Sequence, residues 1–420
     1  MISLPIYSMH DRRVLRDLAR RVAEIADDPV MEERRQLWSE HNSLRSRRPM
    51  MLVFPEGSWI ELIPQKSLQC ESEWARAAEM RLRQMIYTYD HFQDDTVVEK
   101  EWQASEWWQQ DFFRDTGWGI EIERRQGTEQ RGAFAFKPVI RERADLKKLR
   151  YPEVVYDQAA HERAVEGMHD LFGDILEVKK TGIKHVSFHM MMICTGWLGL
   201  ENILFDMIDR PEFVHEVMRS LESGYHNWLD QLEEMNLLSL NNDNTYQSTG
   251  GNGYTTELPA PDFDPQQVRT IDMWGSSESQ EFQVVSPKMH AEFALQYEKR
   301  LLARFGLNGY GCCEDLSKKL DEVFTIPNLR RISISPFADV DVCAPKLKGD
   351  YIFSWKPHPA HLVGEFNQEL IRDDLRHTVE LARQHGNVLE IILKDTHTCE
   401  HHPERFDRWT QICRQVIDEF

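Results

Sequence analysis

The chain of 420 residues lacks any apolar run close to the ~20 residues that a membrane-spanning helix needs. Its first residues, "MISLPIYSMHDRR", become charged too early for a secretory signal. The seven cysteines are odd in number and scattered, so they do not form a disulfide framework. Basic residues are outnumbered, 50 against 70 acidic ones, and the net charge of -20 repels phosphate backbones. We therefore expect no membrane or nucleic-acid partner and a reduced, cytoplasmic protein.

The composition is that of a globular protein, with 41% hydrophobic and 29% charged residues and no internal repeat. This length is enough for a (β/α)8 barrel with additions or for two domains. Residues 1–45 predict two helices, the second beginning at Asp28-Pro29. In the first, apolar residues recur at steps of three and four: Val14, Leu15, Leu18, Val22 and Ile25. We interpret 1–45 as an N-terminal helical extension.

Short apolar runs alternate with helical patterns from residue 46 onward, which is typical of βα units around a parallel sheet. Eight runs are candidate strands: 50–54, 185–189, 237–241, 270–274, 306–310, 331–335, 350–354 and 388–392. A helix after the fourth run begins at Ser286-Pro287. Eight strands and their helices would close a TIM barrel. The sequence thus predicts an α/β fold, with a single (β/α)8 barrel over 46–420.

A long insertion, roughly 57–180, separates the first two candidate strands. Within it, "WGIEIERRQGTEQRGAFAFKPV" alternates on both sides of a Gly-containing turn and predicts a β-hairpin. The segment "EWQASEWWQQDFF" is rich in aromatic residues. It favours an amphipathic core helix, and the alternative is a lid that places aromatic faces over a planar substrate.

Barrel enzymes build their sites from the loops that follow the strands. Polar or reactive side chains follow every candidate strand here: Glu56; His189; Asn241, Asn242 and Asp243; Trp274, Ser276 and Glu278; Tyr310, Cys312, Cys313 and Glu314; Asp339 and Asp341; Trp355, Lys356 and His358; Asp395, His397 and Cys399. Several have structural explanations, since Asp and Asn cap helices. The concentration of sulfur and imidazole after the fifth and eighth runs is not explained in that way.

Thiolates and imidazoles are the ligands that zinc prefers, and catalytic zinc usually keeps three protein ligands. Residues two apart in an extended chain share a face, as Cys312 and Glu314 would, and His397 and Cys399. The predicted metal site is therefore Cys312, His397 and Cys399, with Glu314 as a fourth ligand or a hydrogen-bonding partner. Cys313 replaces Cys312 if the loop turns early. Alternatively, the adjacent cysteines are small buried packing residues.

Three further residues are candidate catalytic groups. Glu56 and Asp243 would orient substrate or act as a general acid, although helix capping or structural hydrogen bonding explains each equally well. His189 is either a catalytic group or a buried barrel histidine with its hydrogen bonds satisfied.

The second half of the chain resembles a known superfamily. The order "SPKMHAEFALQYEKRLLARFG", "YGCCE", "DYIFSWKPHP" and "DTHTCEHHPERFDRWTQICRQV" is similar to the uroporphyrinogen decarboxylase-like superfamily, and more closely to its zinc-containing branch of cobalamin- and corrinoid-dependent methyltransferases. The resemblance runs from about Asp272 to the C-terminus. In that branch a His-x-Cys pair and a distant cysteine hold zinc. The cysteines fall on Cys312 and Cys399, whereas Tyr310 stands where the histidine is expected, a loss that His397 or Glu314 would make good.

The resemblance implies a methyltransferase with a metal-assisted site and zinc as cofactor. The methyl group would move from a small methoxy or methylamine substrate to a corrinoid protein, or from methyl-corrinoid to a thiol. Cobalamin would be carried by a separate corrinoid protein. The loop "NTYQSTGGNGYTTELPAP" from Asn244 would grip the corrinoid tail or a substrate, or be a mobile surface loop.

The decarboxylases of the superfamily carry an arginine-rich "RQAGRY" signature after the first strand. The corresponding place here reads "FPEGSWIEL", where Glu56 and Glu61 would repel a porphyrinogen with four carboxylates. Decarboxylation of uroporphyrinogen is therefore not expected. The competing hypotheses are another lyase or decarboxylase on the same barrel, and a non-catalytic binding barrel.

Overall fold

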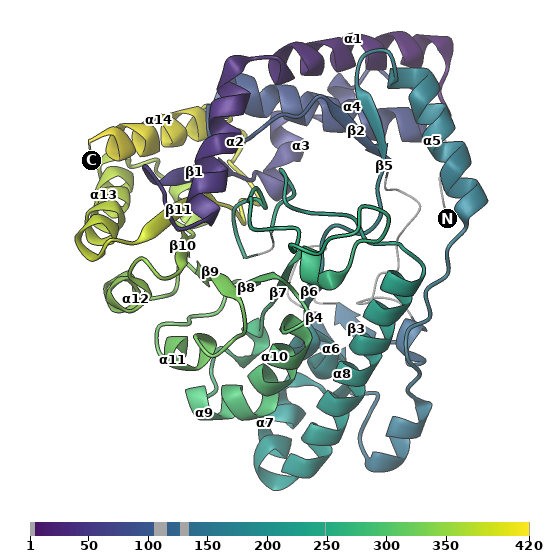
Figure 1. Ribbon diagram of the computed structural model, residues 1–420. Coiled ribbons are helices and arrows are strands. Elements are labelled where there is room, and N and C mark those ends of the chain that lie inside the picture. The colour runs from purple at the N-terminus through teal and green to yellow at the C-terminus, as the bar shows by residue number, and fades with distance from the viewer. Residues whose placement is uncertain (1–4, 105–115, 127–133, 248, 420) are drawn as a thin grey trace.

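The computed structural model describes residues 5–104, 116–126, 134–247 and 249–419 (Figure 1). The α-helices are α1 Met9–Ala26, α2 Pro29–Asn42, α3 Trp59–Leu62, α4 Glu73–Tyr87, α5 Gln158–Phe172, α6 Met190–Leu198, α7 Leu200–Asp209, α8 Pro211–Glu234, α9 Pro287–His290, α10 Gln296–Leu302, α11 Leu320–Val323, α12 Val340–Leu347, α13 Gln368–His385 and α14 Glu404–Asp418. The strands are β1 Met50–Val53, β2 Glu101–Ala104, β3 Glu123–Gln126, β4 Phe134–Lys137, β5 Glu177–Lys180, β6 Ser187–Phe188, β7 Trp274–Ser277, β8 Leu307–Tyr310, β9 Leu329–Ile334, β10 Ile352–Trp355 and β11 Val388–Leu393.

Seven strands form one parallel sheet in the order β1-β11-β10-β9-β8-β7-β6. Figure 1 shows the strands following one another in this order, with α11, α12 and α13 along one side. Strands such as β11, with the sequence VLEIIL, are buried along their whole length, as expected for parallel strands covered on both faces. The α/β prediction is confirmed.

The predicted set of eight strands is wrong in two places. Residues 237–241 form no strand and make one isolated bridge, between Ile183 and Leu238. Asn241 instead uses its side chain to bond the carbonyl oxygens of Lys184 and Trp274, at 2.8 and 2.9 Å. The fourth strand begins at Trp274 rather than at residue 270, because residues 270–272 form a helical turn.

The edge of β1 that faces away from β11 is bonded by Asp94 and Asp95 rather than by another strand, and the Asp95 N–H donates to the Met51 carbonyl at 2.9 Å. The carboxylate of Asp95 accepts from the Met51 N–H at 2.8 Å, and that of Asp94 accepts from the Val53 N–H at 2.9 Å. Among the described residues, no backbone ladder joins β1 to β6. The expected closure of a ring by strand pairing is therefore not observed.

The two predicted N-terminal helices are confirmed as α1 and α2. Asp28 caps α2 by accepting from the Val30 N–H at 2.9 Å, and Pro29 is the first residue of that helix. The apolar stripe of α1 packs into a hydrophobic core that is separate from the larger core around the sheet. This smaller core is shared with α4, α5 and the buried face of β2.

The insertion contains the predicted hairpin, in which β3 pairs with β4 in antiparallel register. Its turn, 127–133, lies outside the described residues. The expectation of a helix in "EWQASEWWQQDFF" is wrong at its start, because residues 101–104 form β2 and pair in parallel with β5. Trp102 is buried there against Phe172, with 4.7 Å between ring centroids. Residues 105–115, with the rest of the aromatic segment, also lie outside the described part.

The Gly-rich loop after Asn244 is not a mobile surface loop. Gln247, Thr249 and Asn252 are at most 4% exposed, because this loop fills the space beside β8 to β11. A Cβ on Gly309 of β8 would meet the Thr249 hydroxyl at 2.2 Å. Gly251 has a φ of +57°, and a Cβ there would come within 2.5 Å of the Glu390 carboxylate, so this approach requires glycine.

That loop packs onto a buried ion pair. Arg331 at the start of β9 and Glu390 in β11 are both 0% exposed, with 3.0 Å from Nε to Oε1. His41 of α2 lies 3.2 Å from the other Glu390 oxygen. Burial alone would raise the pKa of Glu390, but Arg331 and His41 hold it at about 2. The carboxylate is therefore charged inside the molecule, where it depends on these two partners.

Within the described ranges, no single helix is long and apolar enough to cross a membrane. The pair α6 and α7 would pass by length and composition alone, but the two helices are bent by 92° relative to each other.

Replacing Arg331 by Met is expected to lower the free energy of unfolding by about 3–5 kcal/mol, because Glu390 would lose its guanidinium partner while buried. Urea denaturation near neutral pH measures this change. The control Arg376→Met breaks a half-exposed pair with Glu419 and should cost about 1 kcal/mol or less. Equal losses in the two variants would contradict a dominant role for the buried pair.

Candidate functional site

Residues that follow the seven paired strands meet at one edge of the sheet, because all seven strands run in the same direction. Polar or reactive side chains stand at these positions: Glu56 after β1, His189 after β6, Glu278 after β7, Cys312 and Cys313 after β8, Ser335 after β9, Lys356 after β10 and Lys394 after β11. Their contacts define the candidate site.

His189 and Glu278 form a close pair. β6 pairs with β7 through Phe188 and Ser277, so the next residue of each strand lies beside the other. The distance from His189 Nδ1 to Glu278 Oε1 is 2.7 Å, and Glu278 is 2% exposed. Burial, with the nearby Glu314 carboxylate, raises the pKa of Glu278 to about 8, and burial lowers the pKa of His189. Near pH 7 the pair holds a protonated carboxyl beside a neutral imidazole.

Two further acidic residues lie next to this pair. Burial, with Glu278, raises the pKa of Glu281 to about 8. Glu314 is 1% exposed, and its two oxygens accept from the backbone N–H groups of Ser279 (3.1 Å) and Cys312 (2.8 Å). Glu314 therefore ties the loop after β7 to the loop after β8.

Cys312 and Cys313 place their sulfurs side by side, 3.5 Å apart. The hydrogen bond between them, with burial, raises the pKa of the Cys312 thiol, and the same bond lowers the pKa of Cys313. The Lys394 ammonium also favours a thiolate at either sulfur. One thiol of the pair donates to the other sulfur.

Lys394 connects Glu56 to the cysteines. Its Nζ lies 3.8 Å from Glu56 Oε1, 3.9 Å from Asp395 Oδ1 and 6.0 Å from the centre of the Tyr246 ring. Burial would lower the pKa of Lys394, but Tyr246, Asp395 and Cys312 raise it further than burial lowers it. This lysine is a fixed cation at the edge of the site.

Lys356 is a second, more deeply buried lysine. Its Nζ bonds the hydroxyl of Ser333 at 2.6 Å and the carbonyl of Thr249 in the Gly-rich loop. Burial, with repulsion by Lys394, lowers its pKa to about 7. Lys356 thus holds the loop beneath the site and is half protonated near neutral pH.

Tyr310, which stands at the position where the resemblance places a zinc-binding histidine, is engaged elsewhere. It is fully buried, and its hydroxyl lies 2.8 Å from His290 Nε2 and donates to Glu298 at 2.8 Å. Those partners are on α9 and α10, so the phenol points toward the helices and not toward the cysteines.

The residues present do not fit the zinc ion that the resemblance implies. No three His, Cys, Asp or Glu side chains of the described residues are placed to hold a metal ion. The predicted set of Cys312, His397, Cys399 and Glu314 is therefore not assembled. The loop after β11 is not extended, since Asp395 has a φ of +58°. His397 is exposed while Cys399 is buried, so the two do not share a face.

Cys399 is engaged with Glu61 of α3. Its thiol donates to Glu61 Oε2 at 3.1 Å, and the same oxygen accepts from the backbone N–H groups of Cys399 and His401. Burial and Glu61 raise the pKa of Cys399 to about 11, so its sulfur stays protonated near pH 7.

Asp243 does not join the carboxyl-end group. Its carboxylate pairs with Lys184, which precedes β6, and accepts from the hydroxyl of Thr245 at 2.6 Å. It organises the start of the Gly-rich loop at the opposite ends of the strands. These contacts favour a structural hydrogen-bonding role for Asp243 over a role in catalysis.

Reasoning from sequence missed Lys394 and Tyr246, and it considered Glu61 only as a charge that would repel a substrate with carboxylates. Lys394 directly follows the apolar run of β11, so counting one more position along the strand would have found it. No local signal marks Tyr246 or Glu61, because each reaches its partner from a segment far away in the chain.

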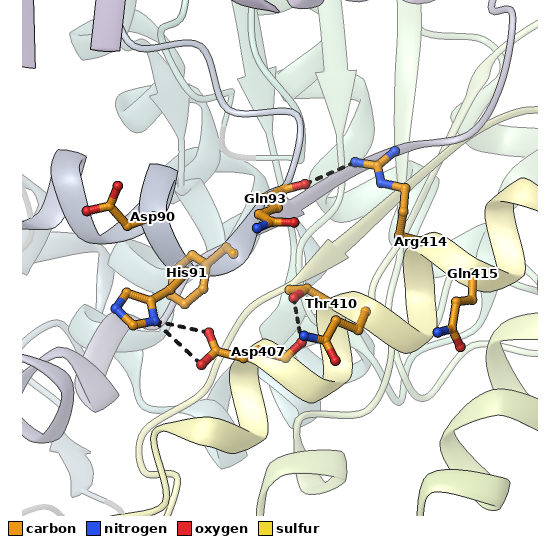
Figure 2. Close-up of a pocket in the computed structure, with 9 residues that line it drawn as sticks. Asp90, His91, Gln93, Asp407, Thr410, Arg414 and Gln415 are labelled. Carbon is orange, nitrogen blue, oxygen red and sulfur yellow. Dashed lines mark hydrogen bonds and ion pairs between the residues drawn. The ribbon is translucent and has the colours of Figure 1, made fainter. Parts of the chain in front are cut away.

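A separate hollow lies on the outer surface between residues 90–93 and α14 (Figure 2). His91 lies 3.3 Å from Asp407 there, and Arg414 donates to the Gln93 carbonyl at 3.3 Å. None of the residues lining this hollow follows a strand of the sheet, so it is distinct from the candidate site.

Three buried carboxyls, Glu278, Glu281 and Glu298, should each contribute a loss of stability as the pH rises from 4.5 to about 8. Burial raises the pKa of Glu298, as of Glu278 and Glu281, from 4.5 to about 8, so the folded state binds more protons than the unfolded chain in this window. Urea denaturation across the window should show a smaller fall for Glu298→Gln, which keeps partners for Ser279 and Tyr310. Glu380→Gln, at an exposed position, should keep the wild-type slope. An unchanged slope in Glu298→Gln would contradict the assignment.

Comparison with protein families and with curated proteins finds no match to this chain. Among solved structures, a methyltransferase from Methanosarcina mazei is similar over 92% of this chain and 98% of its own, with a TM-score of 0.48 and 9% sequence identity.

Proposed function

We propose that this protein is a methyltransferase that removes the methyl group from a small methoxylated substrate at the carboxyl ends of its strands. The acceptor is a corrinoid carried by a separate protein, which enters as a second substrate. The observation that carries the proposal is Glu278, a buried carboxyl 2.7 Å from His189 whose pKa is raised to about 8.

Methyl ethers react slowly because the departing oxygen leaves as an alkoxide or phenoxide unless it is protonated. An ordinary carboxyl is ionised at neutral pH and cannot supply the proton. Glu278 remains protonated there and lies at the edge of the sheet where barrel enzymes hold substrates. It is therefore suited to act as a general acid.

In the proposed step the second substrate, a corrinoid in its reduced cob(I) form, supplies the electron pair for a new bond to the methyl carbon, and the carbon–oxygen bond of the methoxy group breaks. The Glu278 proton goes to the departing oxygen, which leaves as a hydroxyl group. His189 positions the carboxyl through its 2.7 Å contact, and solvent returns the proton after the product leaves.

The opposite side of the site orients the substrate in this proposal. Lys394, held by Glu56 and Asp395, supplies a fixed positive charge to a carboxylate or phenolate of the substrate. Lys356 contributes indirectly, because it holds the Gly-rich loop beneath the site. No step is assigned to zinc, since the described residues do not form a site for it.

Glu278→Gln should lower kcat for demethylation at least about 100-fold, as expected when a general acid is removed. In the wild type, activity should fall as the pH rises through about 8, because Glu278 then loses its proton. The substitution should abolish this dependence. The absorbance of cob(I)alamin, mixed with enzyme and a panel of methoxylated aromatic acids, measures methyl transfer.

Glu298→Gln is the matched control, because the Glu298 carboxyl is also buried and its pKa is also raised to about 8. Glu298 lies on α10, where it accepts hydrogen bonds from Ser279 and Tyr310. In this variant, activity should still fall as the pH rises, with the same midpoint as in the wild type. Absence of methyl transfer from every ether tested would contradict the proposed reaction. Transfer with an unchanged pH profile in Glu278→Gln would contradict only the role of Glu278.

A further inference from the structure

Cys312 and Cys313 differ from the other cysteines in exposure and in proximity. Both are partly exposed at the carboxyl end of β8, whereas the other five are buried. Their sulfurs are 3.5 Å apart, within contact distance of each other. An oxidant that enters the site from solvent therefore meets two thiols together.

The backbone keeps these sulfurs side by side. The Cys312 N–H donates to Glu314 at 2.8 Å, and the Cys312 carbonyl accepts from the Ser333 hydroxyl at 2.8 Å. Gly311, with a φ of +93°, makes the turn that precedes them. Because both the N–H and the carbonyl of Cys312 are held in this way, the two thiols can react with each other without rearrangement of a long loop.

Two lysines lie close enough to act on the sulfurs. The ammonium of Lys394 favours the thiolate form at both cysteines. Lys356 also interacts electrostatically with Cys312 and Cys313. The carboxylates of Glu278, Glu314 and Asp395 act in the opposite direction. A thiolate is the form of cysteine that attacks peroxides and disulfides. Partial exposure and close proximity of two sulfurs occur together only at this pair among the described cysteines.

From this geometry we infer that Cys312 and Cys313 form a reversible oxidation site, in which a hydroperoxide converts the two thiols into a disulfide. One sulfur attacks the peroxide and becomes a sulfenic acid, and one molecule of water or alcohol leaves. The second sulfur then attacks the first, the S–S bond forms, and a second molecule of water leaves. The two thiols lose two electrons and two protons in total, which the peroxide takes up.

Such a bond should be easily reduced. The Cα atoms of adjacent residues are ~3.8 Å apart across a trans peptide, closer than the ~4.4–6.8 Å usual for a disulfide. A disulfide formed at this spacing is strained, and strained disulfides are readily reduced by other thiols. The site is therefore suited to reversible modification and not to permanent cross-linking. It does not depend on the proposed methyl transfer.

The test treats the folded full-length protein with one to a few equivalents of hydrogen peroxide, blocks remaining thiols and analyses the tryptic peptide of residues 305–318 by mass. We expect this peptide to lose two hydrogens, about 2 Da, and to recover its mass with dithiothreitol. Cys312→Ser and Cys313→Ser should each abolish that loss. Cys399→Ser, at a buried thiol, should retain it.

Circular dichroism confirms that each variant is folded before oxidation. Gain of oxygen on the peptide without loss of two hydrogens would overturn the inference, because the sulfurs would then be oxidised separately. Full alkylation of both thiols after peroxide treatment would also overturn it. The same peptide in protein unfolded by urea should form the disulfide at least several-fold less, since it lacks the anchoring by Glu314 and Ser333.

Discussion

The candidate site depends on the parallel register of the seven-stranded sheet. Each strand ends at the same edge, so residues from one end of the chain to the other become neighbours there. His189 meets Glu278 because Phe188 pairs with Ser277 one position earlier. A shift of one residue in that register would turn one of the two side chains to the other face of the sheet. The chemistry of the site is therefore set by backbone pairing.

The second requirement is that water is kept from the groups beneath this edge. The Gly-rich loop, packed on the Arg331–Glu390 pair, fills the space beside β8 to β11. Burial then changes the protonation of the groups around it. It brings the pKa of Lys356, which bonds the Thr249 carbonyl of this loop, to about 7. The buried Arg331–Glu390 pair thus supports the loop that surrounds Lys356.

The two cysteine regions differ because their neighbours differ. Cys399 donates to Glu61 and keeps its proton, whereas Cys312 and Cys313 face each other near Lys394. Burial and Glu61 keep the Cys399 thiol protonated near pH 7, whereas Cys312 and Cys313 are the pair for which we infer reversible oxidation. The resemblance to zinc methyltransferases points to Cys312 and Cys399, but Tyr310 bonds Glu298, Cys399 bonds Glu61, and the described residues form no group of three metal ligands.

The sequence by itself determined the α/β class, the two N-terminal helices, the hairpin and most residues at the strand ends. These follow from local periodicity, capping and turn chemistry, which act over a few residues. It could not determine that 237–241 forms no strand, that the Gly-rich loop is buried, or that Cys399 meets Glu61. Such contacts join segments far apart in the chain, and the choice between them depends on burial and packing, which only the tertiary structure decided.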